Sequence, residues 1–595
     1  MLKTVDWLGI FLFFLASLAV GVAVARRAGK STSEFFLSGR DMPWWLLGIS
    51  MVATTFASDT PNLVTDLVRT HGVAGNWLWW AFLLTGMLTV FVYSRLWRRS
   101  GLLTDLEFYE LRYSGRPAAF LRGLRALYLG VFFNVIVMAA VTLAIVKIGG
   151  VLFQVRPVPT VIAAAGVTMV YSALGGLRGV LFTDLFQFVI AMTGSIAAAV
   201  YVLGLPQIGH LEGLLNHAAV AGRLSLFPDF SDSRALLAVF IIPLAVQWWS
   251  VWYPGAEPGG GGYIAQRMLA AKNENHALGA TFLFNVAHYA LRPWPWIIVA
   301  LASLVVFPDL ESLRRSFPHI DPAIVRNDLA YPAMLTFLPH GLLGLVVASL
   351  FAAYMSTIST HLNWGSSYIV NDFYRRFLRP QADEKRLVRV GRISTLLLMT
   401  AAAAVALLLQ NSLQAFNIML QVGAGTGALF ILRWFWWRIN ALSEITAMVV
   451  SLLVAVYFEF IHWRLGLSPL DDWQKLTLGV AITTASWLVV TLVSRPTDRS
   501  TLVAFCRLIR PGGPGWRTVL KEAGEDEADR SASGRGWDVP SGLVCMFLGC
   551  GAIYSALFAT GYWIYARPVH ALALTFSAVL FSLLLASAWR RVRSV

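Results

Sequence analysis

Residues 43–69 read PWWLLGISMVATTFASDTPNLVTDLVR, an apolar stretch that is long enough to cross a bilayer but is interrupted halfway by polar residues. Pro61 lacks an amide proton and disfavours the helical conformation of Thr60, so a regular helix cannot run through this point. Backbone released from helical hydrogen bonds inside a membrane is tolerated only where it is buried in protein or lines a cavity. The stretch therefore predicts a broken membrane helix that takes part in binding, with a simple kink as the alternative interpretation.

A second interruption lies in residues 246–272, VQWWSVWYPGAEPGGGGYIAQRMLAAK, where prolines and glycines cannot continue a helix. It follows the first interruption by five predicted spans. Interruptions at corresponding positions of two five-helix halves indicate a transporter built from inverted repeats. A surface loop is the alternative interpretation of this second stretch.

The composition of the 595-residue chain supports a membrane protein, because 57% of residues are hydrophobic and only 13% are charged. Soluble domains carry roughly 25% charged residues. This composition excludes a soluble enzyme, a disordered chain and a secreted disulfide scaffold, and the three cysteines have no metal-ligand or disulfide spacing. At about 20 apolar residues per span, we expect about fifteen membrane helices, near 5–25, 43–68, 76–97, 120–148, 157–175, 179–204, 234–254, 276–307, 330–371, 390–409, 413–434, 440–463, 475–494, 541–565 and 569–589.

The net charge of +15 follows the predicted topology. If the N-terminus is outside, the basic clusters near 26–40, 95–116, 375–392, 433–438 and 590–593 all fall on one side. Basic loops mark the cytoplasmic side of a membrane protein. We therefore expect a multi-pass protein of a bacterial-type plasma membrane, with the N-terminus outside and the C-terminus in the cytoplasm, and no nucleic-acid partner.

A helix rich in hydroxyl groups is predicted over residues 351–374, FAAYMSTISTHLNWGSSYIVNDFY. Ala353, Ser356 and Thr357 have the i, i+3, i+4 spacing that places them on one helical face. Hard oxygen ligands suit a small hard cation, and an uncharged set suits a monovalent one. The alternative is that the hydroxyls only bond back to carbonyls of their own helix.

Four stretches together resemble the sodium:solute symporter family, which includes bacterial proline, sialic acid and sugar symporters and the animal sodium–glucose transporters. They are SEFFLSGRDMPWWLLGISMVATTFAS (33–58), GGLRGVLFTDLFQ (175–187), AQRMLAAKN (265–273) and the hydroxyl-rich helix. The resemblance implies an all-α, leucine-transporter-type fold of five-plus-five inverted repeats with a leading helix and extra C-terminal helices. We expect 1–42 to be the leading helix and a cytoplasmic loop, 43–204 the first repeat, 205–233 an external loop, 234–438 the second repeat, 439–494 accessory helices, 495–540 a flexible cytoplasmic linker and 541–595 a C-terminal helix pair.

The resemblance also implies a sodium site built from five oxygen atoms. Backbone carbonyls would come from Ala53, Phe56 and Ala353, and hydroxyl groups from Ser356 and Thr357. Asp184 corresponds to an acidic position near the ion path in the family. An ordinary interfacial aspartate paired with Arg178 is the alternative.

Positions that contact sugar in the sugar-transporting relatives correspond here to Thr55, Thr60, Trp79, His288 and either Leu420 or Gln421. Histidine and leucine replace lysine and glutamine, which argues against a hexose bound in the same way. Ionisable residues inside a membrane are costly and mark pathways or pair with one another. We therefore add Asp59 and Glu257 as candidate ligands for a cationic or hydroxylated group, Arg292 as a candidate for a carboxylate, and Trp252 as a candidate gate. Asp66 lies seven residues after Asp59 on the same face, and structural ion pairs are the alternative interpretation of these charges.

We expect a sodium-coupled secondary symporter that imports a small organic solute by alternating access. Its partners would be the solute, a co-transported sodium ion and membrane lipid, without an organic cofactor. No H-E-x-x-H, G-x-S-x-G or P-loop pattern points to an enzyme. A proton-coupled symporter that uses Asp59, Asp184 or His288 and a transporter-like solute sensor are the alternatives, and the identity of the solute and the oligomeric state stay open.

Overall fold

The computed structural model describes residues 2–28, 31–55, 57–250, 257–409, 412–522 and 537–593. Within these ranges the chain is helical and has no strand beyond one isolated bridge between Met42 and Ala271. Ten helices there are long and apolar enough to cross a membrane, and four shorter apolar helices accompany them. The all-α polytopic architecture is thus confirmed, whereas the count of about fifteen spans stays a prediction.

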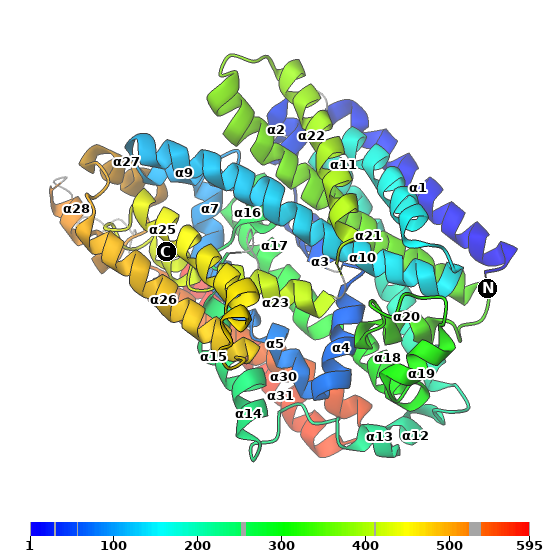
Figure 1. Cartoon of the computed structure of the whole chain (residues 1–595). Coiled ribbons are helices and arrows are strands. Elements are labelled where there is room, and N and C mark those ends of the chain that lie inside the picture. Colours follow the sequence, from blue (N-terminus) through cyan, green and yellow to red (C-terminus); the bar gives the residue numbers. More distant parts are fainter. Residues whose placement is uncertain are drawn as a thin grey trace.

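The leading helix α1 (Thr4–Ala28) packs along α11 and α21 at one side of the bundle (Figure 1). A left-handed backbone at Gly176 (φ 54°, ψ −169°) divides α11 into two arms, as the two spans predicted at 157–175 and 179–204 require. The first group of helices after α1 and α2 (Thr32–Leu37) consists of α3 (Trp44–Thr55), α4 (Thr60–His71), a segmented helix through α5 (Trp77–Trp80), α6 (Leu83–Leu88) and α7 (Ser94–Ser100), then α8 (Phe108–Arg112), α9 (Gly115–Leu127) continuing into α10 (Asn134–Phe153), and α11 (Pro157–Leu203).

The second group repeats the pattern of a broken helix followed by long ones. Its long helix α21 packs against both α11 and α3, so the two groups share one core. The group consists of α14 (Ser233–Leu236), α15 (Ile242–Ala245), α16 (Gly262–Ala270), α17 (Glu274–Val286), α18 (Pro293–Val306), α21 (Leu342–Ser367), α22 (Glu384–Ala406), α23 (Ser412–Gly423) and α24 (Gly427–Leu432), with the short connecting helices α12 (His210–Asn216), α13 (Ala218–Ala221), α19 (Leu310–Ser316) and α20 (Ala330–Leu335).

The remaining described helices are α25 (Ala441–Val456), α26 (Asp472–Val493), α27 (Arg499–Ile509), α28 (Arg517–Glu522), α30 (Val539–Ile564) and α31 (Pro568–Arg593). The expectation of a flexible linker over 495–540 is wrong for its first part. Helix α27 is amphipathic and buries Leu502, Phe505 and Ile509 against the bundle. Burial of this apolar face outweighs the polar composition that suggested a flexible segment, and residues 523–536 lie outside the described residues.

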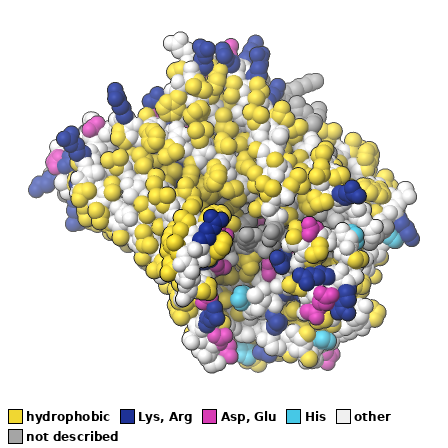
Figure 2. Space-filling model, in the orientation of Figure 1, with side chains coloured by type: hydrophobic (Ala, Val, Ile, Leu, Met, Phe, Trp, Pro, Cys, Tyr) yellow, Lys and Arg dark blue, Asp and Glu magenta, His cyan; other side chains and the backbone are white. Residues whose placement is uncertain are grey.

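The outer surface has the apolar character of a chain solvated by lipid. Val569, Phe576 and Leu583 recur every seven residues along one face of α31 and expose 76%, 70% and 65% of their surface. Figure 2 shows a broad hydrophobic face, with Lys and Arg side chains along its upper edge. An exposed apolar face of this extent is stable only against lipid or another protein.

Candidate functional site

The predicted break in the first repeat is present. Helix α3 ends at Thr55 and α4 begins at Thr60, with Ala57 to Asp59 in the non-helical connection. Pro61 lies in the first turn of α4, where its missing amide proton breaks no hydrogen bond. Phe56, a predicted sodium ligand, lies outside the described residues.

The hydroxyl-rich helix α21 lies directly against this break. Oγ1 of Thr357 lies 2.7 Å from the carbonyl oxygen of Thr54, at the end of α3. The same hydroxyl lies 3.1 Å from the carbonyl oxygen of Ala353, which is the bond within the helix that the alternative interpretation expected. Ala353, Ser356 and Thr357 are all buried. Four of the five predicted sodium ligands are thus described, and one of them, Thr357, contacts the end of α3.

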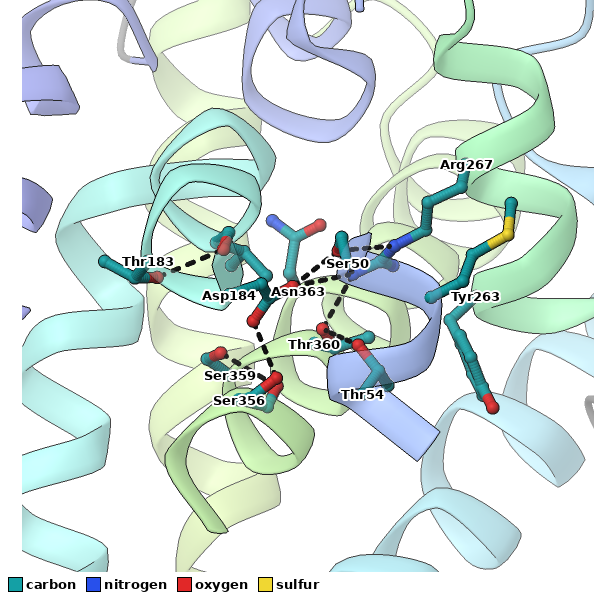
Figure 3. Close-up of polar contacts among 12 residues, drawn as sticks. Ser50, Thr54, Thr183, Asp184, Tyr263, Arg267, Ser356, Ser359, Thr360 and Asn363 are labelled. Atoms are coloured by element: carbon teal, nitrogen blue, oxygen red, sulfur yellow. Dashed lines mark hydrogen bonds and ion pairs between the residues drawn. The ribbon is translucent and has the colours of Figure 1, made fainter. Parts of the chain in front are cut away.

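Asp184, on the second arm of α11, lies beside Ser356 and Ser50 (Figure 3). Its carboxylate accepts hydrogen bonds from Ser356 Oγ at 2.7 Å and from Ser50 Oγ at 2.5 Å. The cation near it is Arg267, at 3.9 Å, rather than Arg178. Asp184 is therefore connected to the predicted ion site through the Ser356 hydroxyl.

Arg267 was missed by sequence reasoning, although a charged residue inside the apolar AQRML stretch was an available signal. It lies on α16, directly after the second break, and is completely buried. Its guanidinium donates to Thr360 Oγ1 at 2.7 Å and to Ser50 Oγ at 3.2 Å. Since Thr360 lies on α21 and Ser50 on α3, one arginine ties the second broken helix to both sides of the predicted ion site (Figure 3). A buried charge needs such a complete set of partners.

A cavity of about 100 Å³ adjoins the first break. Thr54 and Thr357 line it, so the cavity and the predicted ion site share a wall. Five of the predicted substrate residues also line it, namely Thr55, Asp59, Thr60, Trp79 and His288, together with Arg292. Tyr263 and His361 are additional lining residues that sequence reasoning did not single out.

Contacts between neighbouring side chains hold the polar walls of this cavity in place. Thr55 Oγ1 and Tyr263 Oη are 2.8 Å apart, which joins the end of α3 to α16. The indole Nε1 of Trp79 donates to Asn76 Oδ1 at 2.8 Å, and the Trp79 ring stacks on Tyr289 with centroids 5.8 Å apart. These contacts fix the orientation of Thr55, Tyr263 and Trp79, so this part of the cavity wall is preformed.

Two further predicted substrate residues, Glu257 and Gln421, lie elsewhere. Glu257 forms a buried ion pair with Arg125 and does not line this cavity. Gln421 and Leu420 line a separate cavity of about 450 Å³, together with Asp471 and Asp472 near the start of α26. Trp252, the candidate gate, lies outside the described residues.

Comparisons with known proteins agree with this architecture. The model of the sodium:solute symporter family matches residues 35–451. A sodium/glucose cotransporter of Vibrio parahaemolyticus is 25% identical over 501 residues, which cover 80% of this chain and 88% of the relative. A sodium/mannose cotransporter of Bos taurus is 27% identical and covers 78% of this chain and 80% of its own length.

Among solved structures, a Na+-coupled sialic acid symporter in a substrate-bound outward-open state has a TM-score of 0.66 at 21% identity. The alignment covers 83% of this chain and 99% of that one. The fold is accordingly the leucine-transporter type that the resemblance implied. Because the family model spans most of the chain and runs through both broken helices, this protein belongs to the sodium:solute symporter family.

Proposed function

We propose that this protein is a sodium-coupled symporter that carries a small organic solute across the membrane. The observation that carries the proposal is the contact between Thr357 and the Thr54 carbonyl at the end of α3, because both residues also line the cavity. An ion bound at this contact and a solute in the cavity would share a wall. Ordering of that wall by one would therefore favour binding of the other.

The sodium ion would lie among the carbonyl oxygens of Ala53, Phe56 and Ala353 and the hydroxyl oxygens of Ser356 and Thr357. The hydrogen bonds around Ser356 support this assignment. Its hydroxyl proton is directed at Asp184, so the lone pairs of its oxygen stay available for a cation. Asp184 would thus orient a ligand rather than bind the ion itself, as outer-shell carboxylates do at metal sites.

Coupling requires that sodium bind the outward-facing and inward-facing states with different affinities. Oxygens from α3 and α21 can close around an ion only while the two helices are in contact, and this contact would change when the two repeats move. Each charge that crosses a potential of 100 mV contributes about 2.3 kcal/mol. This energy, together with the sodium concentration gradient, would drive solute accumulation.

We also propose that the N-terminus is outside and the C-terminus in the cytoplasm of a bacterial-type plasma membrane. The positive-inside rule supports this orientation, since with the N-terminus outside the basic clusters near 26–40, 95–116, 375–392, 433–438 and 590–593 all fall on the cytoplasmic side. Trp252 stays a candidate gate, and Glu257 and Gln421 stay candidate substrate residues although they do not line this cavity. An expressed fusion to a compartment-specific reporter at the C-terminus tests the orientation.

The sodium site can be tested before the solute is known. We expect the unfolding temperature of the purified protein to rise with sodium but not with potassium, because an ion bound to the folded state stabilises it. The double variant Ser356→Ala/Thr357→Ala should lose this difference. Ser366→Ala is the matched control, since that buried hydroxyl lies on α21 and donates to the carbonyl oxygen of Asn363 on its own helix.

An undiminished sodium effect in the double variant would overturn the assignment of the site. In proteoliposomes, solute uptake should require an inward sodium gradient. Uptake driven by a pH gradient in sodium-free buffer would instead support the proton-coupled alternative.

A further inference from the structure

A second cavity, of about 480 Å³, lies among α1, the end of α10, the first arm of α11 and α21, at one side of the bundle (Figure 1). It shares no lining residue with the cavity beside the first break. Thr160 and Thr168 line it, but their hydroxyl groups donate to carbonyl oxygens of their own helix, at 3.1 and 2.9 Å. The cavity therefore offers mainly apolar surface to a ligand.

The cavity is long and borders the surface that lipid covers. Trp7, Ile10 and Phe14 line it from one face of α1 and follow that helix for about 10 Å, at about 1.5 Å per residue. Trp7 exposes 54% of its surface, and neighbouring Phe11 and Ile162 expose 62% and 67%. Exposed apolar side chains of this size are stable here only against lipid. A ligand would therefore enter the cavity from the bilayer.

Two basic residues, Lys3 and Arg156, lie at one end of this cavity. Each directly follows a lining residue in the sequence, and both are exposed. The ring centroids of Trp7 and Phe153 are 5.6 Å apart, which places the start of α1 beside the end of α10, so both cations belong to the same end. Basic residues beside a membrane surface attract anionic lipid headgroups.

Asp6, an acidic residue at this end, has its own partners. Its buried carboxylate accepts hydrogen bonds from the amides of Gly341 at 2.6 Å and Gly344 at 3.0 Å, and from Nδ1 of His340 at 2.8 Å. These contacts attach the start of α1 to the start of α21. The negative charge of Asp6 is therefore directed at α21, and the end of the cavity keeps a basic rim.

We propose that this cavity binds an acyl chain of an anionic phospholipid, whose phosphate group contacts Lys3 and Arg156. An acyl chain fills a long apolar cavity without leaving a polar group unpaired, whereas a polar solute would lose its hydrogen bonds to water there. A phosphate group accepts charge-assisted hydrogen bonds from both lysine and arginine. The apolar walls and the basic rim together match the two parts of one lipid molecule.

The bound chain contacts the helix that carries the proposed sodium ligands. Phe351 and Met355 line the cavity, and Met355 lies between Ala353 and Ser356 in α21. Packing against Met355 favours the present position of α21, so sodium should bind more tightly when the lipid is bound. This consequence rests on the proposed function, whereas the lipid site itself does not.

The test measures lipid binding to the purified full-length protein in sodium-free potassium buffer. Native mass spectrometry and the unfolding temperature are compared for phosphatidylglycerol and phosphatidylcholine that carry the same acyl chains. Glycerol phosphate supplies the charge of the headgroup without a chain. We expect phosphatidylglycerol to be retained and to raise the unfolding temperature the most, and glycerol phosphate to have no effect. Equal retention of the two phospholipids would overturn the proposal.

The double variant Lys3→Gln/Arg156→Gln tests the rim. It should weaken retention of phosphatidylglycerol by about thirtyfold, because each basic residue near a membrane surface contributes a factor of about five. Both side chains are exposed, so the fold should be unaffected. Arg567→Gln, on an exposed arginine after α30, is the matched control and should leave retention unchanged. Undiminished retention in the double variant would overturn the assignment of the headgroup.

The variant Ala163→Trp tests the cavity. Ala163 lines it and is exposed, so the added ring would take up space that the acyl chain needs, and selective retention should be lost. Ala573→Trp adds the same side chain on the exposed face of α31 and should retain the lipid. Equal retention in these two variants would overturn the proposal.

A sodium titration in each phospholipid then tests the link to α21. A sodium response that is the same in both lipids would contradict the coupling and leave the lipid site intact. A protein that retains phosphatidylglycerol but does not respond to sodium in either lipid would instead overturn the proposed function.

Discussion

The two broken helices differ in what their interrupted backbone contacts. At the first break, the Thr54 carbonyl accepts a hydrogen bond from a hydroxyl of α21, Ser58 Oγ donates to the Val141 carbonyl oxygen, and the Asp59 carboxylate faces a cavity. At the second, the described residues 257–262 are fastened on the first repeat by an ion pair from Glu257 to Arg125 and a hydrogen bond from Trp97 to the Gly259 carbonyl oxygen. Similar local chemistry thus produces a candidate binding element in one place and an anchored segment in the other.

The anchoring of the second break continues into α16. Asp105 accepts a hydrogen bond from the amide of Gly262 at 2.9 Å and another from Tyr368 Oη at 2.5 Å. A carboxylate at the start of a helix also interacts favourably with the helix dipole. The first repeat therefore supplies the group that holds the start of α16, and α16 in turn carries Arg267 to the proposed ion site.

The largest difference between the breaks should appear when their acidic residues are removed. Glu257→Ala leaves the buried Arg125 without its partner and should lower the free energy of unfolding by about 3–5 kcal/mol. Asp59→Asn, which breaks no ion pair, should change it by less than about 1 kcal/mol. Chemical unfolding of both variants in the same detergent measures the two effects. Equal destabilisation would contradict the distinction between an anchored and an unanchored carboxylate.

A smaller effect is expected from Trp97→Phe. This change removes the indole proton that Gly259 O accepts at 2.7 Å and leaves a buried carbonyl without its donor, at a cost of about 1–3 kcal/mol. The measurement is again the unfolding midpoint. Trp563→Phe is the control, because it also removes an indole hydrogen bond, to Thr575 Oγ1 at 3.2 Å, but on an exposed side chain of α30, and it should therefore cost less. A response to Trp97→Phe no larger than that of the control would show that the second break is held by other contacts.

The smallest effect concerns the backbone of the second break. Gly260 has a φ of +89°, and a Cβ there would lie 2.6 Å from the Met268 methyl group, so Gly260→Ala should cost about 1–2 kcal/mol. Gly166→Ala is the control, because that helical glycine has open space around its missing Cβ and should become slightly more stable. Thermal unfolding of both variants checks the sign. Stabilisation by both would mean that the conformation of this segment is not strained.

Much of the ion site could be predicted because its signals are local. The position of the first break follows from Pro61 and the polar residues before it, and the shared face of Ser356 and Thr357 follows from helical spacing. That these elements meet was predicted only through the family resemblance. No local pattern places Thr357 beside Thr54, which lies about 300 residues earlier in the chain.

The substrate residues could be predicted only in part. Asp59 and Glu257 are both acidic residues beside prolines in broken helices, and no local feature separates them. The two residues differ because Glu257 forms an ion pair with Arg125, which lies on α9 in the first repeat. Tyr263 and His361 could not be predicted either, because their side chains reach the cavity through the way α16 and α21 pack together.

The sequence by itself determined that the chain is apolar, all-helical and interrupted twice, because composition and the conformational limits of proline and glycine act within a few residues. Only the tertiary structure decided which charge is neutralised inside the protein and which faces a cavity. Partners of buried polar groups come from helices that are distant in the sequence, and their choice depends on how those helices pack. The division between anchor and binding site therefore arises from packing.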